Sequence, residues 1–114
     1  CEETVVEDGD LDKRGNRVRL DRPHGYVFEV PAEGTAPAVP LKALGRFVHE
    51  AVAVDPNTGV VYETEDRTPS GFYRFTPIEK GNLAAGGKLE MLKVERAPDL
   101  IRQAMPGHDY PVTW

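Results

Sequence analysis

The chain has 114 residues, of which 39% are hydrophobic and 29% charged, so its size and composition are those of one folded domain and not of a disordered segment. Its formal net charge of −5 disfavours non-specific binding to nucleic acid or to an anionic membrane surface. A single cysteine excludes an internal disulfide, and no apolar run reaches the ~20 residues that span a bilayer.

The sequence pattern in the first part of the chain indicates little regular structure. Short β-rich runs predict strands at residues 4–6 and 26–30, and a solvated loop dense in Asp, Arg and Lys separates them over residues 7–22. Prolines frame residues 31–40 and predict an extended connector, while residues 41–47 predict one short helical turn.

The middle of the chain carries the clearest pattern, because β-rich runs alternate there with compact turn signals. We expect turns at residues 55–59 and 68–71, where Pro and Gly supply the backbone angles that a reversal needs. The predicted strands are residues 47–54, 60–65, 72–76 and 88–94. Four antiparallel strands in sequence predict an all-β fold built on a four-stranded meander.

A meander of this kind is typical of one blade of a β-propeller or of one sheet of a sandwich. In the propeller interpretation, residues 1–35 belong to part of one blade, residues 44–95 form a four-stranded blade, and residues 96–114 connect to the next blade. Beyond Ala97 we expect a turn or two of helix, ended by prolines and a glycine. The chain lacks a start methionine and a terminal cap, so we expect the natural protein to extend past both ends.

Acidic residues gather where the first two predicted strands meet. Glu50 lies near the start of the first strand, in a run that otherwise looks fully buried, and Glu65 and Asp66 end the second. Because a short turn joins these antiparallel strands, Glu50 and Glu65 are predicted to converge. Clustered carboxylates repel one another unless a cation lies between them, and oxygen ligands suit hard ions such as calcium.

A simpler interpretation of these acids stays open on the residues alone. Strand ends are often acidic because they are wet, and Glu50 could lie in water or pair with Arg46 or Arg67. Cys1 would favour a site only if its thiolate reached the same place, since sulfur selects a transition metal over calcium. The three histidines show no zinc-site spacing and the only serine lies in a turn, so no catalytic residue is predicted.

Four segments together resemble the PhoX-type alkaline phosphatases and their relatives. They are CEET at residues 1–4, HGYVFEV at 24–30, GRFVHEAVAVDPNTGVVYETED at 45–66 and GFYRF at 71–75. The resemblance implies a six-bladed β-propeller, periplasmic or extracellular and usually exported by the twin-arginine route. Such a protein hydrolyses phosphate monoesters with ferric iron and calcium at the end of its central channel. This chain would then be an internal fragment of one to two blades.

The resemblance also implies the metal ligands. Cys1 matches the cysteine of the family's Thr-Cys-Glu-Glu segment, whose thiolate binds iron, and Glu2 adjoins it. Glu50 matches the acid of the His-Glu-Ala-Val-Ala segment. Glu65 and Asp66 match the Thr-Glu-Asp segment, for which calcium is the expected ion.

The intact parent is therefore expected to be a metal-dependent phosphatase, whereas this chain alone is expected to lack ligands from other blades and to be inactive. Arg67 could hold a phosphate oxygen, although a salt bridge to Asp66 or Glu63 is the simpler role. One alternative is a non-catalytic propeller module that binds or scaffolds a partner. Another is a lipoprotein acylated at Cys1, which the early predicted strand disfavours. Two copies of the fragment could also exchange strands across their bare edges.

Overall fold

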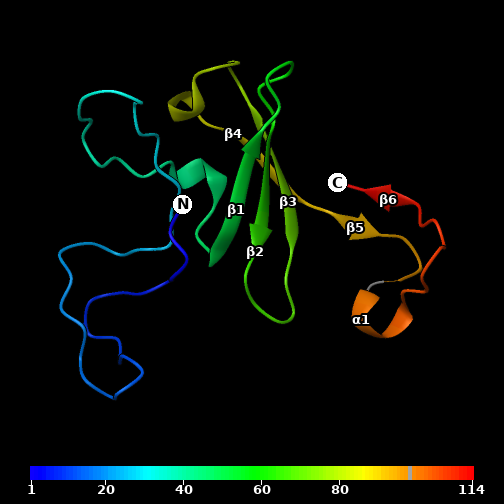
Figure 1. The fold of residues 1–114 in the computed structure, drawn as a ribbon, viewed down its shortest axis with the longest axis horizontal. Coiled ribbons are helices and arrows are strands. Elements are labelled where there is room, and N and C mark those ends of the chain that lie inside the picture. Colours follow the sequence, from blue (N-terminus) through cyan, green and yellow to red (C-terminus); the bar gives the residue numbers. More distant parts are fainter. Residues whose placement is uncertain (98) are drawn as a thin grey trace.

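A computed structural model of the chain describes residues 1–97 and 99–114, with a sheet at its centre (Figure 1). The sheet has four antiparallel strands in the order β1-β2-β3-β4. These strands are β1 (His49–Val54), β2 (Val61–Glu65), β3 (Phe72–Pro77) and β4 (Gly87–Met91). The predicted all-β meander is confirmed, because each strand pairs with the next one along the chain.

The first hairpin turn forms as its sequence predicts. The Asp55 carboxylate accepts hydrogen bonds from the Asn57 backbone N–H (2.9 Å) and the Thr58 hydroxyl (2.6 Å). Gly59 donates its N–H to the Asp55 carbonyl at 2.8 Å and adopts a φ of 78°, a value that glycine reaches without steric cost. This turn sets the register in which the ends of β1 and β2 face each other.

The remaining elements are short. They are the 3₁₀ turns η1 (Lys42–Leu44) and η2 (Leu83–Ala85), the strands β5 (Lys93–Val94) and β6 (Val112–Thr113), and the helix α1 (Leu100–Gln103). The predicted helical turns at residues 41–47 and beyond Ala97 are confirmed by η1 and α1. The prediction of a single strand over residues 88–94 is wrong, because β4 ends at Met91 and the chain then pairs β5 with β6 in a separate two-stranded ribbon.

Strands at residues 4–6 and 26–30 are also predicted wrongly. Each run makes only an isolated bridge, between Val6 and His24 and between Phe28 and Pro40. The paired segments run antiparallel to each other only at these single positions, so neither run forms a ladder. The charged loop between them is mostly exposed, as predicted.

One face of the sheet packs against the N-terminal segments and η1 to form a small core. The residues in this core are Val27, Leu41, Leu44, Val61 and Phe75. Phe75 lies at its centre, with no exposed surface, and pairs with Val61 on one side and Leu89 on the other. The radius of gyration is 16.6 Å, whereas a compact domain of similar size has about 13 Å. The chain is therefore flat and extended for its length.

The opposite face of the sheet carries an aromatic group. Trp114 packs on Phe72 and Tyr62, with ring centroids 5.6 and 6.1 Å apart, and the Arg74 guanidinium lies 4.7 Å from the Trp114 ring centroid. These contacts attach the β5–β6 ribbon to the sheet. No helix in the described parts of the chain is long and apolar enough to cross a membrane.

Candidate functional site

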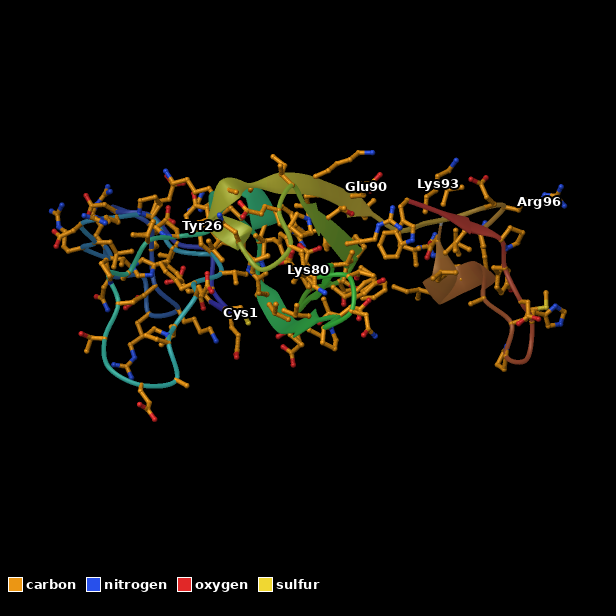
Figure 2. The ribbon with its side chains drawn as sticks, turned by 90° about the horizontal axis from the view of Figure 1, so that it is seen from above. Cys1, Tyr26, Lys80, Glu90, Lys93 and Arg96 are labelled. Carbon is orange, nitrogen blue, oxygen red and sulfur yellow. The ribbon has the colours of Figure 1, made fainter. Side chains whose placement is uncertain are left out.

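Three chain segments meet at one end of the four-stranded sheet. The His49 N–H donates to the Glu2 carbonyl at 3.2 Å, and the Asp66 N–H donates to the Val48 carbonyl at 2.9 Å. Figure 2 shows Cys1 between the N-terminal loops and the sheet. The backbone segments that carry the predicted ligands are therefore neighbours, as the hairpin geometry requires for β1 and β2.

Glu50 lies at an irregularity in the pairing of β1 with β2. The register between β1 and β2 shifts between His49 and Ala51, so Glu50 occupies a β-bulge and its side chain is exposed. The expected burial of the whole strand is wrong, since β1 is an edge strand and Val54 is 53% exposed. Among the described residues, Arg46 pairs with Glu7 and Arg67 lies near Glu65, and neither forms an ion pair with Glu50. The simpler interpretation that the Glu50 carboxylate lies in water therefore fits its position.

Glu65 is held by the protein itself. Its Oε2 accepts hydrogen bonds from the Gly71 N–H and the Tyr73 hydroxyl, each at 3.0 Å. Burial first, and then the Glu65 carboxylate, raises the pKa of Tyr73, so this phenol stays protonated as a donor. Arg67 Nε lies 3.8 Å from Glu65 Oε1, so Arg67 faces Glu65 and not the expected Asp66 or Glu63. Asp66 itself is exposed.

Glu2 has a similar set of donors. Its carboxylate accepts hydrogen bonds from the Gly25 N–H (2.6 Å) and the Tyr26 N–H (2.9 Å), and the His24 Nδ1 lies 2.6 Å away. Partial burial raises the pKa of Glu2, but the hydrogen bonds from Tyr26, Gly25 and His24 outweigh it and the net pKa is lowered. Cys1, next to it, is an exposed free thiol.

The predicted ligands do not assemble into one metal site within this chain. Across residues 1–97 and 99–114, no three His, Cys, Asp or Glu side chains gather closely enough to hold a metal ion. Protein donors already occupy carboxylate oxygens of Glu2 and Glu65, which leaves Cys1, Glu50 and Asp66 as exposed groups. The described residues therefore do not fit a complete iron or calcium site by themselves.

An open cleft lies beside Cys1 and Glu2, with a volume of about 1530 Å³. The N-terminal loops, η1 and part of η2 line it. Its basic lining residues are Arg19, Arg22, His24 and Lys42, and its acidic ones include Asp21 and Glu29. The sequence analysis did not find this cleft, because its walls come from loops that are distant in sequence.

A buried pair, His49 and Glu63, lies on the core face of the same end of the sheet. Both side chains are 0% exposed, and His49 Nε2 lies 3.1 Å from Glu63 Oε2. Sequence analysis considered Glu63 only as a possible salt-bridge partner of Arg67. Its position two residues after the buried Val61 was the available signal, because alternate residues of a strand share a face.

The structure thus defines an all-β protein in which acidic segments converge at one end of an antiparallel sheet. The family model of alkaline phosphatase PhoX matches residues 1–114, so the chain belongs to this family and the resemblance seen in the sequence is confirmed. No curated protein and no solved structure matches the chain.

Proposed function

We propose that this chain is part of a metal-dependent phosphatase that hydrolyses phosphate monoesters. The observation that carries this proposal is the match to the alkaline phosphatase PhoX family over residues 1–114. The convergence of the Glu2, Glu50 and Glu65 segments supports it, because a metal centre needs ligands from several segments at one place.

Calcium and ferric iron are the proposed metals. Cys1 would supply sulfur to iron, while Glu50 and Asp66 would supply exposed carboxylates, with Glu2 and Glu65 at their sides. Bound cations would neutralise the charge that develops on the phosphoryl oxygens.

We further propose that the remaining ligands come from other parts of a six-bladed β-propeller, in which residues 44–95 form one blade, residues 1–35 contribute to another and residues 96–114 lead onward. The small core and the extended shape support this, because neighbouring blades would cover the faces that stay exposed. The chain alone would then be inactive, and its β1 edge could pair with a second copy. A periplasmic or extracellular location belongs to the same proposal.

Two substitutions in the full-length protein test the proposal. Cys1→Ser and Glu50→Gln are expected to remove bound iron and to abolish hydrolysis of a phosphate monoester such as p-nitrophenyl phosphate. Glu33→Gln is the matched control, because Glu33 is an exposed carboxylate outside the cleft and the sheet. Iron is measured by elemental analysis, and activity with and without added calcium. Unchanged iron and activity in both variants would refute the assignment, and a wild-type protein without phosphatase activity would favour a non-catalytic propeller module.

A further inference from the structure

The β5–β6 ribbon is attached to the rest of the fold at few points. In the described parts of the chain, no backbone hydrogen bond joins β5 or β6 to the four-stranded sheet. The Leu92 N–H donates to the Phe72 carbonyl at 2.8 Å, and the ribbon begins at the next residue, to one side of the sheet (Figure 1). A ribbon with two residues in each strand is at best marginally stable alone in water, so its contacts with the sheet decide whether it forms.

Trp114 makes the side-chain contact between the ribbon and the sheet. The Arg74 guanidinium lies 4.7 Å from the Trp114 ring centroid, which is within the range of a cation–π interaction. The rings of Tyr62 and Phe72 pack against the same indole. Because Trp114 directly follows β6, this one side chain connects the ribbon to β2 and β3.

The sheet itself holds Arg74 in place. Arg74 lies directly opposite Glu90 on the β3–β4 ladder, and its Nη2 donates to Glu90 Oε2 at 2.9 Å. The Lys88 ammonium lies 2.7 Å from the other oxygen of the same carboxylate. The guanidinium is therefore positioned whether or not the ribbon covers it. The Arg74 Nε–H is buried and no described residue accepts a hydrogen bond from it, which costs free energy in the covered form.

We propose that the contact between Arg74 and Trp114 is a latch, through which the β5–β6 ribbon closes on the face of the sheet opposite the core and opens from it while the four strands stay folded. This inference does not rest on the proposed function. One side chain of the ribbon holds the closed form and the buried Arg74 Nε–H opposes it, so the ribbon opens at a lower free energy than the sheet unfolds. Opening uncovers Tyr62, Phe72 and Arg74, which together form an aromatic and basic surface.

The test measures amide hydrogen exchange in the chain, in peptides that cover residues 93–95 of the ribbon and 72–76 of β3. In the wild type, residues 93–95 are expected to exchange faster than residues 72–76. Arg74→Met keeps the aliphatic stem but removes the cation, and it should speed exchange at residues 93–95 by about 2–30-fold without changing residues 72–76. The matched control is Arg102→Met, because Arg102 is 85% exposed in α1 and should leave both peptides unchanged. Trp114→Ala should have at least the effect of Arg74→Met, and the double variant should equal Trp114→Ala, since the contact is then already lost.

Unchanged exchange at residues 93–95 in Arg74→Met would overturn the proposal. Exchange that rises equally at residues 72–76 would also overturn it, since the ribbon would then unfold only together with the sheet. Effects of Arg74→Met and Trp114→Ala that add fully in the double variant would show that Arg74 does not act through the indole, and the latch would be wrong. If Arg74→Met does not fold, Trp114→Ala decides by the same comparison, because Trp114 lies outside the core around Phe75.

Discussion

Replacement of Glu2 by glutamine is expected to destabilise the protein by about 1–3 kcal/mol. The carboxylate accepts the N–H groups of Gly25 and Tyr26 and lies 2.6 Å from His24 Nδ1. A glutamine oxygen can still accept both N–H groups, but it carries no charge, so the charge-assisted hydrogen bonds become weaker neutral ones. Because the Glu2 side chain is 24% exposed, water offsets part of the loss and the lower half of the range is expected.

The lowered pKa of Glu2 also predicts how the stability of the protein changes with pH. The pKa of Glu2 in the folded protein lies below its ordinary value of 4.5, so the stabilisation is complete above that pH and is lost as the pH falls through the folded value. Glu2→Gln should therefore have a lower free energy of unfolding than the wild type at about pH 7. As the pH falls, its free energy of unfolding should decrease less steeply than that of the wild type. Urea denaturation followed by circular dichroism measures both effects. The matched control is Glu3→Gln, an exposed neighbour; equal behaviour of the two variants would refute the reasoning.

Two further predictions concern the core face. Phe75→Ala should lower the free energy of unfolding by about 3–5 kcal/mol, because the ring is fully buried, and a loss below about 1 kcal/mol in urea denaturation would contradict the described core. Tyr73 should ionise above its ordinary pKa of 10.0, because burial and Glu65 both disfavour the phenolate. In an ultraviolet absorbance titration, the tyrosine transition at the highest pH should be absent from Tyr73→Phe. An unchanged titration would show that another tyrosine is responsible.

The meander could be predicted because its signals are local. The turn at residues 55–59 contains its own hydrogen-bonding groups around Asp55, and the flanking β-rich runs are long enough to pair. The end of β4 could not be predicted in the same way, since residues 88–94 keep an alternating pattern while their partner changes from β3 to β6. The pairing partner of a strand is determined by the whole fold and cannot be predicted from the sequence of that strand alone.

The candidate site was predictable only at the level of segments. Antiparallel pairing brings Glu65 opposite His49, but the bulge that exposes Glu50 depends on local irregularity that the hydrophobic pattern does not reveal. The burial of Glu63 depends on its neighbours His49 and Tyr73, which come from the two adjacent strands. The sequence does not distinguish a carboxylate on an apolar face from one at a solvated strand end. Its burial becomes apparent only from its neighbours in the folded structure.

The chain contains one tryptophan, Trp114, and it lies where the β5–β6 ribbon meets Tyr62 and Phe72 of the sheet. Its intrinsic fluorescence consequently reports whether the ribbon is docked and carries no direct signal from the core around Phe75. An emission change can thus arise from release of the ribbon while the four-stranded sheet is still intact, so fluorescence and a probe of the sheet monitor two different events in this protein.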